Sequence, residues 1–330
     1  MKDTINFGLI GCGAVSKLHI AAINKLESAR FVAASDVSPT NLQQVVDTYH
    51  VRGYIDYHDL LRDKSVDVVS ILTASGLHAS IGIEAAQYGK HVIVEKPIDV
   101  TIEKAQELID ACHKHKVFLS CIYQHRYDKP VIALKQAVDQ GKLGRLNACC
   151  CHTKWYRTQE YFDVAKWRGT IALDGGALMN QSIHYIDLMQ HIMGPVDEVF
   201  GYTATLAHQR IETEDIGMAV LKFKSGALGI IEGSISAYPS FYTRLDVHGD
   251  KGGIMLENDA ILQWKTQDET DCAQELKIKG EQAHRLQLQE IVDAIHLGHQ
   301  PLVTGEEALK ALRIILAIYD SAKTGIPVKL

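Results

Sequence analysis

The sequence has no block of basic residues and no long apolar run, and both absences exclude whole classes of protein. Its 330 residues carry a net charge of −6, so nucleic acid and anionic membranes are poor partners. No run approaches the roughly 18 apolar residues of a membrane span. The opening residues MKDTINFGLIGCG lead directly into a strand and a glycine turn, without the features of a signal peptide. We therefore expect a cytoplasmic protein that binds neither nucleic acid nor membranes.

Cysteine is too sparse and too unevenly placed for a disulfide framework. The seven cysteines are an odd number, no CxxC pair occurs, and Cys149, Cys150 and Cys151 are consecutive. Neighbours in a strand point to opposite faces, so this triplet is a poor source of disulfides. The pattern predicts reduced thiols and no structural zinc. We interpret the triplet as core filling and not as a reactive cluster, because free cysteine is usually buried.

The first third of the chain alternates between strand-like and helix-like segments. β-rich runs occur at 5–10, 31–36, 66–73, 91–95 and 118–122, with helical patterns between them. Thr101 is a plausible N-cap for the helix that ends near 115. Strands that alternate with helices predict a doubly wound parallel sheet with right-handed crossovers. Residues 1–122 are therefore predicted to form a Rossmann domain of an α/β protein.

The rest of the chain, residues 123–330, has a different pattern. Long β-rich runs occur at 147–155, 198–207, 217–223, 227–236, 242–248 and 261–264, separated by turns such as KSG and GDKGG. They predict a substrate-binding and oligomerisation α+β domain with a large, mostly antiparallel sheet. Two helices close the chain, and the last of them can pack back on the first domain. Exposed β-rich faces lead us to expect a homodimer or homotetramer formed through this sheet.

The segment Gly11-Cys12-Gly13-Ala14-Val15-Ser16 lies where the first strand meets a helix. Gly11 allows the tight turn, Gly13 lets the backbone approach a pyrophosphate, and the helix N-terminus offers its amides to the phosphates. Asp36 ends the second strand, where a carboxylate can accept from both ribose hydroxyls and would repel a 2′-phosphate. The predicted cofactor is NAD, and the residues expected to bind it here are Gly11, Gly13, Ala14, Val15 and Asp36.

A lysine follows the fourth strand, in Glu95-Lys96-Pro97. Ligands of doubly wound sheets bind beyond the carboxyl ends of the strands, so Lys96 is predicted to lie above the cofactor. Partial desolvation lowers the pKa of a lysine towards neutrality, which suits proton exchange beside a hydride transfer.

The segment 173–192 reads as an apolar helix with a polar line. Asn180, His184, Asp187 and His191 would share one helical face. Such a line meets water, a ligand or hydrogen-bonded partners in the core, because burying it unpaired is costly. His184 and Asp187 also have the i, i+3 spacing of metal ligands. His191 lies two turns away, too far to complete a compact site, and we predict no metal.

Taken in order, GLIGCGAV, TASGLH, VEKP and GGALMNQSIHYIDL resemble the Gfo/Idh/MocA family of nicotinamide-dependent sugar oxidoreductases, almost end to end. Within that family, the segment YRTQEYFDVAKWRGTIALDGGALMNQSIHYIDLMQHIMGPVDEV looks like the WlbA/WbpB group. Those enzymes oxidise the 3-hydroxyl of UDP-N-acetyl-2-amino-2-deoxyglucuronate in O-antigen (lipopolysaccharide) biosynthesis. The resemblance implies an NAD-dependent UDP-sugar dehydrogenase that acts on a CH–OH group.

The resemblance also implies roles for single residues. Lys96 and His184 match the family's catalytic Lys and His. Positions near the nicotinamide are matched by Thr73, Ser75, His78, Glu95, Lys96 and Gln124, and positions near the substrate by Arg126, Trp167, Arg168 and Asn180, the last of which is Asp in many relatives. Arg126, Arg157 or Arg168 could pair with a uronate carboxylate, and the sequence does not rank them.

The sequence departs from the family pattern at several positions. His125 stands where the subgroup more often has Asn, and Ala74 where Pro is common. The segment between Trp264 and His284 is shorter than in some UDP-sugar relatives, which puts the sugar in doubt more than the reaction. A dehydrogenase for another sugar or cyclitol and a redox-assisted lyase or glycosidase remain alternatives. A non-catalytic nucleotide-sensing regulator is a third, and the presence of both Lys96 and His184 argues against it.

Overall fold

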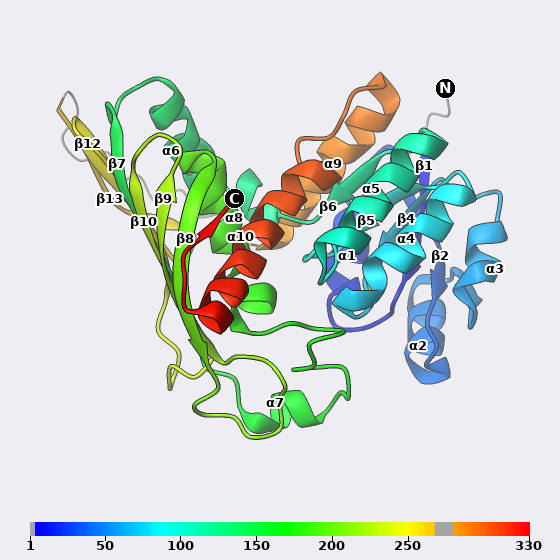
Figure 1. Ribbon diagram of the computed structural model, residues 1–330. Coiled ribbons are helices and arrows are strands. Elements are labelled where there is room, and N and C mark those ends of the chain that lie inside the picture. Colours follow the sequence, from blue (N-terminus) through cyan, green and yellow to red (C-terminus); the bar gives the residue numbers. More distant parts are fainter. Residues whose placement is uncertain (1–3, 268–279) are drawn as a thin grey trace. The chain divides into compact units, whose positions relative to one another are not determined.

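A computed structural model of the protein describes residues 4–267 and 280–330. Its chain divides into two compact units (Figure 1). The first unit comprises Met1–Gln124 and Lys279–Leu309, and the second comprises His125–Ile278 and Lys310–Leu330. The units are therefore not two consecutive segments, because residues 280–309 pack with the N-terminal part of the chain. Most of the segment between Trp264 and His284 lies outside the described residues.

The first unit contains the predicted parallel sheet. Its strands are β1 (Ile5–Ile10), β2 (Ala29–Ser35), β3 (Arg52–Tyr54), β4 (Val68–Ile71), β5 (His91–Val94) and β6 (Leu119–Cys121). They run in the order β3-β2-β1-β4-β5-β6, and all neighbours are parallel. This order reverses direction at β1, which is the arrangement of a dinucleotide-binding sheet. The Rossmann prediction is confirmed. The sequence pattern did not predict the three-residue edge strand β3 or the short helix that follows it, Tyr57–Arg62.

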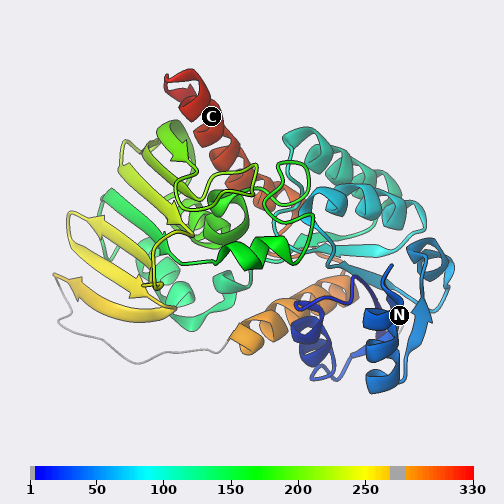
Figure 2. The same ribbon diagram turned by 90° about the horizontal axis from the view of Figure 1, so that it is seen from below.

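Helices cover both faces of this sheet. They are α1 (Ser16–Ile23), α2 (Pro39–Tyr49), α3 (Tyr57–Arg62), α4 (His78–Gln87), α5 (Ile102–His115) and α9 (Gly280–Leu297). Helix α1 packs against α9, and α4 packs against α5 on the opposite face (Figure 2). The predicted cap of α5 is confirmed, since the Thr101 side chain accepts a 3.3 Å hydrogen bond from the Lys104 amide. Phe7 and Leu9 of β1 lie in one core with Leu288 of α9.

The second unit is built on a large sheet. Its strands are β7 (Leu146–Lys154), β8 (Val196–Ala204), β9 (Ile216–Phe223), β10 (Leu228–Ser234), β11 (Thr243–Gly249), β12 (Gly252–Glu257), β13 (Ala260–Thr266) and β14 (Val328–Lys329). The order is β13-β12-β11-β7-β10-β9-β8-β14, and only the β7–β10 pair is parallel. The predicted mostly antiparallel sheet is confirmed. Strand β12 was missed, because its opening glycines were interpreted as part of a turn.

Helices pack on one face of the second sheet. They include α6 (Lys129–Asp139), α8 (Ile183–Met193) and α10 (Gly305–Thr324), whereas the short helix α7 (Gln159–Asp163) follows β7. The turn η2 (Gln124–Tyr127) precedes α6, and in the first unit the turn η1 (Ser75–Leu77) precedes α4. Helix α8 contacts β7 and β11, and its Ile186 and Met189 are buried. A π-helical turn, η3 (Ala177–Ser182), precedes α8.

That π turn corrects the prediction of one continuous α-helix over 173–192. A π turn closes hydrogen bonds from i to i+5 and so takes an extra residue per turn. Asn180 lies inside η3, whereas His184 and Asp187 lie in α8. The i, i+4 register that would align Asn180 with His184 is therefore broken.

Two further expectations concern cysteine and membranes. On β7, Cys149 and Cys151 are buried and Cys150 is half-buried, so the triplet alternates between the two faces as predicted. Burial raises the pKa of all three thiols, which keeps them protonated and unreactive. Cys272 lies outside the described residues. Of the helices that the structure describes, none combines the length and apolarity needed to cross a bilayer.

Candidate active site

The glycine loop after β1 is shaped by two different constraints. Gly11 has φ +101°, and a Cβ there would lie 2.7 Å from the Leu72 carbonyl oxygen, so only glycine fits. A Cβ at Gly13 would meet nothing within 4 Å. The buried Ser16 hydroxyl donates a 2.6 Å hydrogen bond to the Gly13 carbonyl and closes the loop at the start of α1. The open space at Gly13 is where a pyrophosphate would approach the backbone, and the exposed Ala14 and Val15 adjoin it.

The carboxylate of Asp36 is held next to this loop. It follows β2 directly, and one of its oxygens accepts a 2.7 Å hydrogen bond from the Cys12 amide. The other oxygen accepts a 2.7 Å hydrogen bond from the Ser38 amide. Each carboxylate oxygen has a second lone pair, so both can still accept from ribose hydroxyls. The arrangement fits NAD as the sequence predicted.

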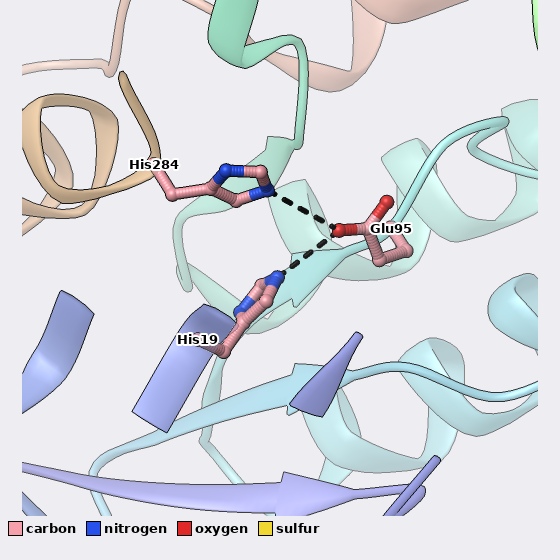
Figure 3. A group of neighbouring side chains, drawn as sticks. All are labelled: His19, Glu95 and His284. Carbon is pink, nitrogen blue, oxygen red and sulfur yellow. Dashed lines mark hydrogen bonds and ion pairs between the residues drawn. The ribbon is translucent and has the colours of Figure 1, made fainter. Parts of the chain in front are cut away.

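Glu95 and Lys96 follow β5 at the same edge of the sheet. The Oε1 atom of Glu95 lies 3.1 Å from the Nε2 of His19 on α1 and 3.9 Å from the Nε2 of His284 on α9 (Figure 3). Its Oε2 accepts a 3.1 Å hydrogen bond from the Lys96 amide. Burial would raise the pKa of Glu95, but the hydrogen bond from His19 and the nearby positive charges outweigh it and lower the pKa to about 2. Glu95 is therefore ionised.

His78 is held by backbone oxygens on both sides of its ring. Its Nδ1 lies 2.7 Å from the Pro97 carbonyl oxygen and its Nε2 lies 3.1 Å from that of Thr73. Burial lowers the pKa of this imidazole. The sequence placed His78 and Glu95 near the nicotinamide ribose. These contacts fix the turn that carries Lys96, and a position beside the nicotinamide stays a prediction for both residues.

The remaining first-unit positions lie beyond the carboxyl ends of neighbouring strands. Thr73 and Ser75 follow β4, and Gln124 follows β6. Thr73 is half-buried and Ser75 is buried. The Oε1 of Gln124 is buried and has no hydrogen-bond partner within the described part of the chain. These positions share one sheet edge with Lys96, which is where a doubly wound sheet binds its ligand.

Arg126 is engaged inside the second unit. Its Nε and Nη2 donate hydrogen bonds of 2.8 and 2.6 Å to the two carboxylate oxygens of Asp187 on α8. Both side chains are 1% exposed. Asp187 belongs to the polar line of residues predicted along this helix. Its partner is the buried Arg126, and not a ligand. The guanidinium of Arg126 is paired with Asp187 and supports α8, and its role in carboxylate binding stays a prediction.

The other two candidate arginines both lie close to one aromatic ring, that of Tyr161. The guanidinium carbon of Arg157 lies 5.5 Å from the centroid of Tyr161, and that of Arg168 lies 4.2 Å from it. Arg168 also donates a 2.8 Å hydrogen bond to the Tyr161 carbonyl and contacts the ring of Trp167. In the residues that the structure describes, no carboxylate pairs with Arg157 or Arg168. Both charges therefore remain available to an anionic ligand.

A polar network joins Arg157 to the π turn. Arg157 donates a 3.0 Å hydrogen bond to Gln181, which donates a 2.7 Å hydrogen bond to the Oδ1 of Asn180. The amide nitrogen of Asn180 donates to Asp174. Sequence reasoning missed Gln181 and Asp174, although both lie within the segment that carried the resemblance. They fix the direction of the Asn180 side chain.

Glu214 was also missed. It is 8% exposed, and its Oε1 accepts from the Leu178 amide at 2.8 Å and from the Tyr319 hydroxyl at 2.9 Å. Burial raises the pKa of this carboxyl and outweighs the hydrogen bonds, which lower it, so that the pKa is about 7. A lone Glu in a loop gives no sequence signal, because its partners come from η3 and α10.

His184 occupies the first turn of α8 and is half-buried. Its ring contacts that of His125 edge-on, with centroids 5.1 Å apart. The Nδ1 of His125 lies 2.7 Å from an oxygen of Asp128 and 3.2 Å from one of Asp259. Burial would lower the pKa of His125, but the two carboxylates raise it to about 10. The structure thus brings a cluster against His184 that the sequence did not reveal.

The loop has no room for a side chain at Gly11, leaves space for a ligand at Gly13 and lies next to the carboxylate of Asp36, as a dinucleotide site requires. The fold and its site therefore define an NAD-dependent oxidoreductase. The sequence comparison makes the assignment specific. Residues 5–123 match the NAD-binding Rossmann fold of the Gfo/Idh/MocA oxidoreductase family, and residues 135–330 match its C-terminal alpha/beta domain. The chain belongs to this family, as its motifs predicted, and is a member of a group of NAD-dependent sugar and cyclitol dehydrogenases.

Two solved structures resemble the whole chain. The WlbA dehydrogenase from Bordetella pertussis, in complex with NADH and UDP-GlcNAcA, is 34% identical, with a TM-score of 0.95 over 100% of this chain and 99% of that one. The WlbA dehydrogenase from Chromobacterium violaceum, with the same ligands, is 34% identical, with a TM-score of 0.93 over 99% and 96%. A myo-inositol 2-dehydrogenase from Thermotoga maritima is 27% identical over 99% of this chain and 98% of its own length.

Proposed function

We propose that the protein oxidises C3 of UDP-N-acetyl-2-amino-2-deoxyglucuronate, with NAD as the hydride acceptor, in the synthesis of a bacterial polysaccharide sugar. The observation that carries this proposal is the end-to-end similarity to two WlbA dehydrogenases that were solved with NADH and UDP-GlcNAcA. The inositol dehydrogenase relative is less similar, at 27% identity. Asn180 also supports the proposal, because the sequence resemblance places Asn at this position in the WlbA-like group and Asp in many other relatives.

The negative charge of the proposed substrate is complementary to two arginines of the second unit. A UDP-linked uronate carries a diphosphate and a carboxylate, and guanidinium groups bind both in bidentate geometry. Arg157 and Arg168 both lie close to the ring of Tyr161, and no described carboxylate neutralises their charges. Trp167 adjoins them. We propose that these two arginines, and not Arg126, bind the anionic groups of the sugar nucleotide.

Lys96 and His184 are the proposed proton-transfer groups. NAD, when bound, takes up the hydride that leaves the sugar carbon. Lys96 or His184 removes the hydroxyl proton, and the cationic form of Lys96 stabilises the developing alkoxide. Glu95 holds the Lys96 backbone through its amide, and His78 holds the following turn through Pro97. In the second unit, the network from Arg157 to Asp174 orients Asn180 for a hydrogen bond to the sugar.

A substrate panel tests the proposal. Purified protein and NAD would be mixed with UDP-N-acetylglucosaminuronate, UDP-N-acetylglucosamine, free glucose or myo-inositol, and NADH would be followed by absorbance. We expect turnover with the uronate alone. Turnover with inositol or a free sugar would contradict the proposed substrate and leave the family assignment unchanged. If no compound gives NADH, tightly bound cofactor should be extracted and identified. A lyase or glycosidase that reoxidises its own NADH would give no net absorbance change.

We also propose that the outer face of the second sheet forms a subunit interface. Met218 and Val220 on β9 are 47% and 56% exposed, and Leu228 and Ile230 on β10 are 61% and 47% exposed. Val220 lies directly opposite Ile230 in the ladder. Clustered apolar side chains of this kind mark interaction surfaces.

The double variant Val220→Lys/Ile230→Lys should therefore lower the mass measured by light scattering from a dimer or tetramer to a monomer. Both side chains are exposed, so the fold of the single chain should tolerate the change. Val37→Lys, at an 86% exposed apolar position of the first unit, is the control and should leave the mass unchanged. A monomeric wild-type protein would contradict the proposal.

A further inference from the structure

A cluster of one imidazole and two carboxylates lies outside the residues assigned to the reaction above. The ligand atoms of His125, Asp128 and Asp259 all lie within 4.8 Å of one another. The Nδ1 of His125 faces an oxygen of each carboxylate, at 2.7 and 3.2 Å. Two ligands bound about 2.0–2.1 Å from one tetrahedral ion are roughly 3.3 Å apart, so these separations need little adjustment to hold a metal.

Three different elements of the second unit bring the cluster together. His125 lies in η2, Asp128 is the residue before α6, and Asp259 lies in the turn between β12 and β13. Asn258 and Asp259 have φ of +47° and +64°, a backbone conformation that Asn and Asp tolerate better than most residues. Tyr185 of α8 steadies the turn with a 3.0 Å hydrogen bond from its hydroxyl to the Oδ1 of Asp259.

Asp128 gives the strongest sign that the cluster is built for a ligand. It occupies the N-cap of α6, yet its side chain makes no capping hydrogen bond and is turned towards His125 instead. Its side chain is 2% exposed, and its Oδ1 is buried with no hydrogen-bond partner within the described part of the chain. A buried carboxylate oxygen without a partner is costly. The Oδ2 of Asp128 faces His125, so a cation bound by both oxygens of this carboxylate would remove that cost.

The charge and exposure of the cluster also suit a cation. Two carboxylates share a single imidazole, so a divalent ion would neutralise them and the imidazole could serve as a neutral ligand. The side chains of His125 and Asp259 are 18% and 38% exposed, which leaves a route of entry and open coordination positions. The group of His19, Glu95 and His284 differs, because it has one carboxylate and is almost wholly enclosed (Figure 3).

We propose that His125, Asp128 and Asp259 bind a Zn²⁺ ion through the imidazole nitrogen and the two carboxylates, with the remaining positions open to water or to an anionic oxygen of a ligand. This departs from the expectation, drawn from the sequence, that the protein has no metal site. His125 and Asp128 are three residues apart, but Asp259 lies far along the chain from both, so no spacing in the sequence indicated the cluster. The ion would lie beside the ring that contacts His184, at the proposed sugar-binding end of α8.

The test uses the full-length, tag-free protein after removal of metal with a chelator. Titration with ZnCl₂ by calorimetry should show one site per chain. Co²⁺ should occupy the same site and give visible absorption bands.

Three variants make the test specific. His125→Asn and Asp259→Asn should each weaken Zn²⁺ binding at least tenfold. The control is His58→Asn, since His58 also lies between two carboxylates, 2.5 Å from Asp56 and 3.0 Å from Glu84, but on the surface. It should leave the affinity unchanged. Thermal melting and NADH binding would check that each variant is folded.

The absence of saturable binding by the wild-type protein would overturn the proposal and leave His125 as a counter-ion of two aspartates. Equal affinities for the wild-type protein and His125→Asn would do the same, by showing that Zn²⁺ binds elsewhere. Neither result depends on which sugar is oxidised, because the readout is metal binding and not turnover.

Discussion

Replacing Lys96 by Met should lower kcat for sugar oxidation by about 100-fold or more, while NADH binding is retained. The methylene stem of Lys96 would be preserved, so the turn fixed by Glu95 and Pro97 keeps its packing, and only the charge and the exchangeable proton are lost. The loss should fall on kcat more than on KM, because the proton is transferred and the alkoxide is stabilised in the transition state. The measurement is steady-state NADH formation, with NADH affinity from a fluorescence titration.

The control for this variant is Lys104→Met, at an exposed position in the first turn of α5. It removes the same charge from the same unit and should leave kcat within about twofold. A Lys96→Met protein with near-normal turnover would remove Lys96 from the mechanism. A protein that no longer binds NADH would instead show that Lys96 holds the cofactor, and the proton-transfer role would pass to His184 alone.

The fold was predictable because its signals are local. Alternation of strands and helices, a glycine turn after β1 and an Asp after β2 are properties of short segments, and they gave the parallel sheet and the NAD site. The failures occurred where local signals conflict or are weak. Gly252 and Gly253 favour a turn, but pairing with β11 and β13 makes them part of β12. The π turn at Asn180 depends on contacts with β9 and β10, which no periodicity within 173–192 encodes.

The site shows the same limit at the level of single residues. A motif gives the chain position of Glu95 or His78, but not the direction in which the side chain points. The His19 partner of Glu95 lies 76 residues away, and the Thr73 and Pro97 carbonyls determine what His78 can do. Residues assigned to a ligand by resemblance therefore divide into those whose charge no described carboxylate neutralises, such as Arg157, and those that support them.

Arg126 and Asp187 form the clearest example of such support, and breaking the pair should have the largest effect on stability. Arg126→Met leaves the Asp187 carboxylate buried and without its bidentate partner. We expect a loss of about 3–5 kcal/mol in the free energy of unfolding. Urea denaturation followed by circular dichroism would measure it, with the transition of the second unit as the readout.

The double variant Arg126→Met/Asp187→Leu separates the strength of the pair from the cost of leaving one charge behind. Both ions are then absent from a region where each side chain is 1% exposed, so most of the stability lost in Arg126→Met should return. A double variant as unstable as Arg126→Met would show that the pair is itself a strong source of stability. Recovery of stability without recovery of turnover would have a different meaning: a hydrophobic contact can support α8, but the ion pair is needed to orient the helix that carries His184.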